Sequence, residues 1–327
     1  VFDRSVGLGA LAISAIYGMS LYFAIELLVV TVIVFLDLLG LDLLIRAAAD
    51  KRKILWAAAG VVFGLSAVAR PTILPFIAIA GVWIAAAGWR SGRARSALSE
   101  AILFAVGVAV PIAPVTLHNY LADGDFVLVA ANGGVNFYIG NNPQSDGITA
   151  VVPGTRADLR GGHEDQARIA REALADPGAS PREISDYWYE RAWRYIRENP
   201  MAAIRHTAFK AFILINAHEV SNNRVIDFVT RHSSLYSWAI LRIWVILPLA
   251  LAGLVVGGGR RQPKHLLLIF LVVYAATVIP FFINARFRMP LAVVLIIFSA
   301  AAVVAWFRWL RSRPLDRALG RRVVVSV

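Results

Sequence analysis

The sequence predicts an all-α polytopic membrane protein with a small α+β insertion that contains a β-hairpin. Of its 327 residues, 58% are hydrophobic, and the mean hydropathy is +0.65. Several apolar stretches approach the roughly 20 residues that a helix needs to cross a bilayer. Basic residues gather in short loops beside these stretches, as is typical of membrane proteins. The formal net charge of +12 therefore reflects membrane topology, and we expect no nucleic-acid partner.

Eight apolar segments account for the predicted membrane helices. They lie at about 6–22, 26–46, 54–69, 72–88, 100–117, 236–258, 266–283 and 290–307. Basic clusters follow their ends at 46–53, 90–95, 260–264 and 308–322. The positive-inside rule places these clusters in the cytoplasm. Two membrane modules, 1–117 and 236–327, then flank an extracytoplasmic region at 118–235.

The first part of that region is predicted to be a β-hairpin. Two β-favouring runs, Phe126–Ala130 and Val135–Ile139, flank the sequence Asn132-Gly133-Gly134. Glycines at this point permit the positive φ angles of a tight hairpin turn.

Helices are expected to follow the hairpin. One covers about 164–175, and a second begins at the capping box Ser180-Pro181-Arg182-Glu183. The second helix carries an apolar stripe made of Ile184, Trp188, Ala192, Tyr195 and Ile196. This stripe should pack against the membrane module or lie at the interface, with an aromatic sugar platform as the alternative. Residues 204–217 predict a helix that lies on the membrane surface.

Two arginine motifs break the charge pattern. Ala69-Arg70-Pro71-Thr72 and Ala285-Arg286-Phe287-Arg288 both fall at the outer surface of the predicted topology. A cation at the membrane edge costs from about 3 kcal/mol upward, so it usually meets an anion. Arginine matches phosphate oxygens well, and in an extended turn Arg286 and Arg288 would face one anionic group. The alternative is that these arginines reach out to lipid headgroups.

Further polar residues near the outer surface are candidates for a donor or acceptor site. They are Glu26, Lys210, His218, Glu219, Asn136 and Asn142. Glu26 suits a base, a metal ligand or a partner of an outer arginine. The asparagines suit sugar hydroxyls, but loop asparagines also bond their own backbone.

Two acidic residues, Asp37 and Asp42, lie inside the second apolar segment. We expect them to pair within the helix bundle. Used instead as coupling sites for a proton or ion, they would indicate a transporter or flippase.

Several kinds of chemistry are excluded. The chain has no cysteine, which removes disulfides, thiolate nucleophiles and cysteine-ligated metals. It also has no P-loop, HExxH, GxSxG or dinucleotide-binding motif, so nucleotide-driven chemistry is not expected. A phosphate-bearing donor should therefore be a lipid.

Four runs of the sequence resemble bacterial family 39 glycosyltransferases, relatives of protein O-mannosyltransferases and of the aminoarabinose lipid A transferase. These runs are Gly64 to Thr72, Asn119 to Val127, Asn132 to Pro143 and Ala285 to Pro290. The resemblance implies a GT-C fold in the bacterial cytoplasmic membrane. It also implies sugar transfer on the extracytoplasmic face from a polyprenyl-phosphate donor to a lipid, glycan or protein acceptor.

Carried over by residue, the resemblance assigns Arg70, Arg286 and Arg288 to the lipid phosphate. Family members carry their catalytic acidic residue in the first outer loop, and this chain begins at Val1 beyond that loop. We therefore expect a fragment whose catalytic residue lies upstream of Val1. No metal ligand is assigned here, and a divalent ion such as Mg²⁺ or Mn²⁺ would be held by that upstream loop. A polymerase or ligase of cell-surface polysaccharide is the neighbouring alternative.

Overall fold

A computed structural model describes residues 2–50, 52–221, 226, 228, 232, 241–256 and 261–312, and within these ranges the protein is all-α. Three helical stretches are long and apolar enough to cross a membrane: Pro71–Arg90, α6 (Ala94–Asp123) and α15 (Ala285–Ser312). A fourth crossing results if the pair α2 (Gly18–Ile25) and α3 (Val30–Asp50), bent by 116°, is one span. These helices make the chain an all-α membrane protein.

The remaining apolar helices are shorter. They are α1 (Arg4–Ile16), α4 (Lys53–Ala69), α13 (Ile243–Val256) and the part of α14 (Arg261–Val278) from Pro263 onward. A short 3-10 turn, η1 (Pro71–Ile73), precedes α5 (Leu74–Arg90). Helices thus occupy the predicted apolar segments within the described ranges, while the start of the segment at 236–258 lies outside the described residues. Which ends face the cytoplasm stays a prediction.

The first predicted segment, 6–22, is broken into two helices at Tyr17. The broken backbone finds its partners in a distant part of the chain, because the Gly18 amide donates to the Leu241 carbonyl at 3.2 Å and the Leu241 amide to Ile16 at 3.3 Å. Backbone groups freed inside an apolar environment need such internal partners.

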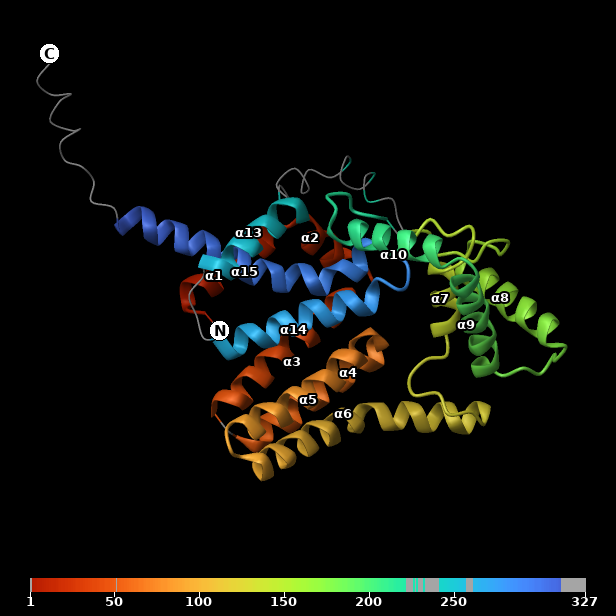
Figure 1. Ribbon diagram of the computed structural model, residues 1–327, viewed down its shortest axis with the longest axis horizontal. Coiled ribbons are helices and arrows are strands. Elements are labelled where there is room, and N and C mark those ends of the chain that lie inside the picture. The colour runs from red at the N-terminus through yellow and green to blue at the C-terminus, as the bar shows by residue number, and fades with distance from the viewer. Residues whose placement is uncertain are drawn as a thin grey trace, which may run out of the picture.

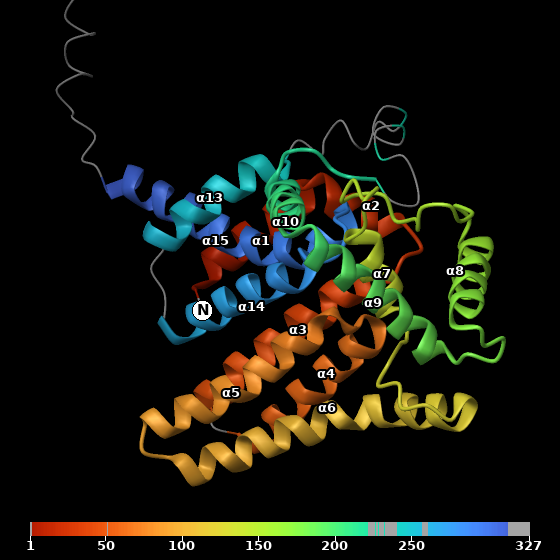
Figure 2. The same cartoon turned by 45° about the vertical axis from the view of Figure 1, so that its right-hand side comes forward.

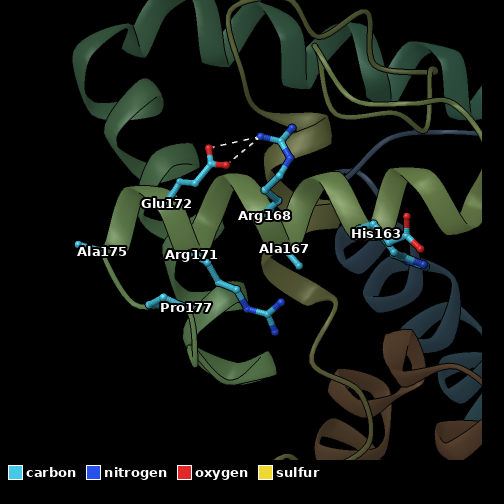
Figure 3. Close-up of a pocket in the computed structure, with 8 residues that line it drawn as sticks. His163, Ala167, Arg168, Arg171, Glu172, Ala175 and Pro177 are labelled. Carbon is cyan, nitrogen blue, oxygen red and sulfur yellow. Dashed lines mark hydrogen bonds and ion pairs between the residues drawn. The ribbon is translucent and has the colours of Figure 1, made fainter.

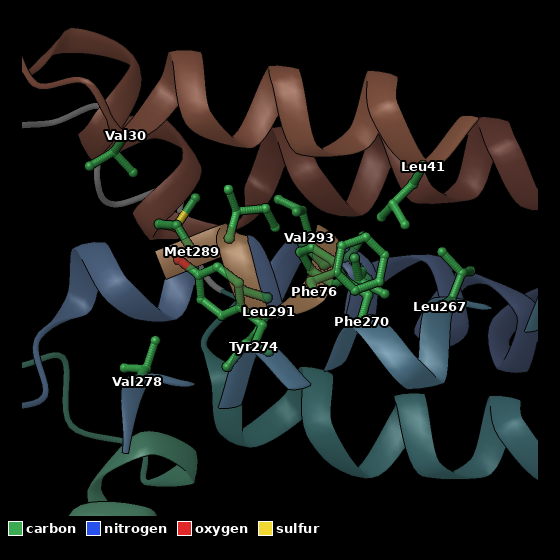
Figure 4. Close-up of a cluster of buried hydrophobic side chains, with 14 of the residues drawn as sticks. Val30, Leu41, Phe76, Leu267, Phe270, Tyr274, Val278, Met289, Leu291 and Val293 are labelled. Carbon is green, nitrogen blue, oxygen red and sulfur yellow. The ribbon is translucent and has the colours of Figure 1, made fainter. Parts of the chain in front are cut away.

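Figures 1 and 2 show α3 to α6 on one side of the bundle and α1, α13 and α15 together on the other. Helix α14 lies between these two groups, and α7, α8 and α9 gather at one end. Figure 4 shows side chains from α3, α5, α14 and α15 meeting in the core, with Phe76 and Phe270 at its centre. Their ring centroids are 5.1 Å apart in an edge-to-face arrangement.

Close packing of α4 on α6 depends on two glycines one turn apart. A Cβ on Gly60 would lie 2.2 Å from the carbonyl oxygen of Phe104, and one on Gly64 would lie 2.5 Å from that of Val108. Small residues four apart let membrane helices approach backbone to backbone.

The predicted β-hairpin is wrong. Residues Val135–Ile139 lie inside helix α7 (Gly133–Gly140), and 126–130 form no strand. Helix packing explains the two glycines better than a turn does. A Cβ on Gly134 would lie 1.8 Å from the carbonyl oxygen of Ser185, and neither Gly133 nor Gly134 has a positive φ. Tertiary packing has overridden the β propensity of a short run.

Helix α9 (Pro181–Glu198) covers α7 with the predicted apolar stripe. Its capping box is confirmed, since the Ser180 amide donates to Glu183 Oε2 and the Glu183 amide to Ser180 Oγ. Trp188 is fully buried, with its ring 4.8 Å from that of Tyr138. The stripe therefore packs on α7, and a buried Trp188 cannot serve as a sugar platform.

Two further helices flank this pair. Helix α8 (Leu159–Leu174) matches the helix expected at 164–175, and α10 (Pro200–Ile215) matches the one expected at 204–217. Along α10 an apolar stripe is exposed every three or four residues, formed by Met201, Ile204, Ala208, Phe212 and Ile215. This stripe is the kind of face that lies against lipid.

We predict that Gly60→Ala lowers the free energy of unfolding by about 1–3 kcal/mol, because the methyl group of the new alanine pushes α4 away from α6. The control is Gly81→Ala in α5, where an added Cβ meets nothing within 4 Å. By helix propensity alone both changes should stabilise. Denaturant unfolding in detergent micelles measures the difference, and equal effects of the two changes would contradict the close approach.

Candidate functional site

Arg70 and Arg286 converge on one aromatic ring. Arg70 ends α4 in an extended conformation, with its amide bonded to the Ser66 carbonyl at 2.8 Å, and Pro71 prevents the helix from continuing. Arg286 lies in the first turn of α15. The Cζ atoms of Arg70 and Arg286 are 4.5 Å and 5.0 Å from the ring centroid of Phe287. Two cations from separate helices therefore share one small region.

Neither guanidinium forms a salt bridge to a carboxylate within the described part of the chain. Arg286 Nε is buried without a hydrogen-bond partner. Both side chains are half-buried, and the charge of Arg70 acts directly on Arg286. Like charges held this close destabilise each other, while contact with the face of Phe287 offsets part of that cost. The arrangement suits an anion placed between them.

A buried polar group lies behind Arg70. Asp37 is 1% exposed, and Ser66 Oγ donates to Asp37 Oδ1 at 2.6 Å. Asp37 Oδ2, Thr72 Oγ1 and Tyr274 Oη are buried without hydrogen-bond partners. The charge of Arg70 reaches both Asp37 and Tyr274. Asp37 therefore has Ser66 as its hydrogen-bond partner inside the bundle and lies within electrostatic reach of Arg70, without an ion pair to it. Asp42 instead pairs with Arg46 at 2.7 Å, one turn along α3.

Arg288 points away from this region. The predicted pair required an extended turn, but α15 begins at Ala285, and residues two apart on a helix differ by about 200° in direction. Arg288 is 2% exposed and donates to Glu219 Oε2 at 3.1 Å, to the Ile213 carbonyl at 2.6 Å and to the His218 carbonyl at 3.2 Å. Its guanidinium joins α15 to the end of α10 rather than facing the same anion as Arg286.

A cavity of about 1180 Å³ opens beside Arg286. Its walls come from α7, the loop at 148–158, α8, the start of α9, and Phe282 before α15. A smaller hollow of about 710 Å³ follows α8 and the turn after it, where Arg168 turns to Glu172 at 3.0 Å (Figure 3). That hollow is lined by α8 and the turn after it alone, whereas the larger cavity is also lined by Arg286, so the larger cavity is the candidate site.

Of the other predicted residues, Asn136 lines this cavity, and its side chain has no hydrogen bond among the described residues. Asn142 is 3% exposed and donates to the Tyr138 and Ile139 carbonyls at the end of α7. The backbone-bonding alternative therefore describes Asn142. His218 is exposed, and Glu219 is the partner of Arg288.

Lys210 is fully buried and fixes three segments. Its Nζ donates to the Gly140 carbonyl at 2.9 Å, to Asn141 Oδ1 at 3.3 Å and to the Pro280 carbonyl at 3.1 Å. Burial lowers the pKa of Lys210 to about 8.

Glu26 lies at the C-terminal end of α2, at the bend before α3. Leu28, two residues further along, lines a narrow gap together with Arg286.

Three residues of this region were not found from the sequence. Phe287 stands between the two arginines of its motif, so its ring was visible as a signal. Asn132 was assigned to a turn, and Gln166 on α8 had no signal at all.

Among the described residues no group of three or more His, Asp or Glu side chains is placed to hold a metal ion. Comparison of the chain with protein-family models, curated proteins and solved structures gave no match.

We predict opposite roles for the two arginines of one motif. Arg288→Ala should lower the free energy of unfolding by about 3–5 kcal/mol, because it leaves Glu219 buried without its partner. Arg286→Ala should leave stability unchanged or raise it, because it removes a cation that Arg70 repels. Denaturant unfolding of both variants measures this, and equal losses would contradict the assignment.

Lys210 should make stability depend on pH. Between about pH 8 and pH 10.5 the unfolded chain binds a proton that the folded chain lacks. The free energy of unfolding should therefore rise with pH in this window, by at most about 1.4 kcal/mol per unit. We expect Lys210→Met to be less stable and to lose this slope, and Lys53→Met, at an exposed position, to keep it. Unfolding curves of both variants from pH 7.5 to 10.5 measure this slope. An unchanged slope in Lys210→Met would show that Lys210 is not the source of the pH dependence.

Proposed function

We propose that this chain is an integral membrane glycosyltransferase that moves a sugar from a polyprenyl-phosphate donor to an acceptor on the extracytoplasmic face. Arg70 and Arg286 bind the donor phosphate. The observation that carries the proposal is the approach of both guanidinium groups to Phe287 without a carboxylate between them. The resemblance of both arginine motifs to family 39 glycosyltransferases supports the same assignment.

A phosphate is the anion that suits this site best. Arg70 lies between the apolar helix α4 and the membrane-sized stretch that begins at Pro71, and Arg286 lies at the start of the membrane-sized α15, so both lie at the ends of apolar helices. A lipid phosphate lies at that depth, with its chain among the helices and its headgroup outside. Arginine forms paired, charge-assisted hydrogen bonds to phosphate, and two arginines offer enough donors for all its oxygens.

The proposed chemistry is displacement at the anomeric carbon. An acceptor hydroxyl attacks the sugar, a bond forms between that oxygen and the anomeric carbon, and the bond to the phosphate oxygen breaks. The polyprenyl phosphate leaves with the electron pair, and the proton of the acceptor hydroxyl passes to a carboxylate base, as the resemblance to family 39 glycosyltransferases implies. Arg70 and Arg286 stabilise the negative charge that the phosphate gains. Phe287 keeps the two guanidinium groups in place before the phosphate arrives.

Transport is the less supported alternative. It would use Asp37 and Asp42 as coupling sites, but Asp42 is half-exposed and paired with Arg46. Asp37 is buried and accepts a hydrogen bond from Ser66 Oγ at 2.6 Å.

We expect Arg70→Ala and Arg286→Ala each to weaken binding of polyprenyl phosphate by about tenfold to a hundredfold, the loss typical of a hydrogen bond between charged groups. Arg205→Ala is the matched control, because Arg205 is an exposed arginine on α10. Binding is measured by native mass spectrometry in lipid nanodiscs. Transfer from a polyprenyl-phosphate hexose should fall in proportion to this loss of binding. If all three variants bind alike, the arginines only contact lipid headgroups.

A further inference from the structure

The cavity beside Arg286 is lined by Gln166, whose side-chain amide has no hydrogen-bond partner among the described residues. Gln166 on α8 is 9% exposed and lines the cavity, and its side chain makes no hydrogen bond to any described residue. Its amide atoms are not among those enclosed by protein, so they open onto the cavity, where a ligand hydroxyl can take the place of water as their hydrogen-bond partner. Because its surroundings are an open cavity, a ligand can supply the missing bonds.

Two asparagines face the same cavity from α7. Asn132 and Asn136 are four residues apart, so they lie on one face of the helix. Asn132 occupies the position before α7 where asparagine commonly caps a helix, yet its side chain makes no capping bond. The contact of Gly134 with Ser185 fixes α7, and therefore both asparagines, against α9. The three amides come from two helices and share one cavity.

Amides suit hydroxyl groups. Each carries two donor hydrogens and a carbonyl acceptor, and a sugar hydroxyl both donates and accepts. A cationic amino sugar would instead need a carboxylate. Among the described lining residues the acidic one is Asp158, and its Oδ1 already accepts the Gly161 amide at 2.7 Å. The lining arginines are Arg156, which pairs with Glu164 and Asp165, and Arg171 and Arg286, whose positive charges would repel an amino sugar.

We propose that Asn132, Asn136 and Gln166 recognise the hydroxyl groups of a neutral sugar carried by the phosphate on Arg70 and Arg286. This inference rests on the proposed function and adds to it the class of sugar. The cavity of about 1180 Å³ exceeds the roughly 300–1,000 Å³ of an ordinary ligand site, so the sugar leaves room for an acceptor.

The test compares three probes: bare polyprenyl phosphate, the same lipid with a neutral hexose, and the same lipid with an amino sugar. The wild-type protein should bind the hexosyl lipid about fivefold to tenfold more tightly than the bare lipid, and the amino-sugar lipid no more tightly than the bare one. In Asn136→Leu and Gln166→Leu the gain from the hexose should shrink to about twofold or less, with bare-lipid binding unchanged. Gln144→Leu, at an exposed glutamine outside the cavity lining, should keep the full gain.

A charge change gives the sharper result. Asn136→Asp places a carboxylate in the cavity, and we expect it to reverse the preference, so that the amino-sugar lipid binds at least threefold more tightly than the hexosyl lipid. Wild-type preference for the amino sugar would overturn the inference. So would a hexose gain that survives in both leucine variants. Either result leaves bare-lipid binding and its dependence on Arg286 intact, whereas loss of that dependence defeats the proposed function itself.

Discussion

The start of α15 is held by buried polar contacts, and the candidate site depends on them. The Ile283 amide donates to the Gly147 carbonyl at 2.8 Å, and the Ala285 amide donates to the Val220 carbonyl at 2.9 Å. Arg288 adds three side-chain bonds, one to the end of α10 and two to the segment after it. Unpaired groups in these places would each cost about 1–3 kcal/mol, so the segment has few other ways to pack. Arg286 takes its direction from this fixed start.

The same contacts connect the membrane helices to the α7–α9 group. Pro280, just before α15, accepts hydrogen bonds from Lys210 and from the Asn141 side chain at the end of α7. The end of α7 also packs closely on this segment, because a Cβ on Gly140 would lie 2.4 Å from the Phe281 carbonyl oxygen. The cavity wall that carries Asn136 is therefore held in register with Arg286. One network positions both the cation and the amides.

Much of the fold follows from local sequence signals. Apolar length predicts the membrane helices, and the capping box at Ser180 predicts the start of α9, because both signals act within a few residues. The error at Val135–Ile139 has the opposite origin. Two β-branched residues and two aromatics in this run do favour a strand. The contact that favours a helix instead is made by the preceding Gly134 with Ser185, 51 residues away. A single sequence contains no sign of that contact.

The site divides in the same way. The two arginine motifs were visible because charge at an apolar boundary is costly wherever it occurs. That Arg286 and Arg288 separate was not visible, because it depends on whether the turn is extended or helical. Gln166 could not be found, since a glutamine on an amphipathic helix is ordinary until a cavity surrounds it.

Charge and polarity vary in order across the site. Asp37 and Tyr274 lie inside the bundle, Arg70 and Arg286 lie at its end, and the amides lie in the cavity beyond. A ligand that satisfies all of these groups needs an anion at one depth and uncharged hydroxyls farther out. A free phosphate would leave the cavity amides without hydrogen-bond partners, and a free sugar would leave the two arginines repelling each other. A sugar joined to a lipid phosphate meets both requirements in one molecule, and its chain has the apolar faces of the membrane helices to follow.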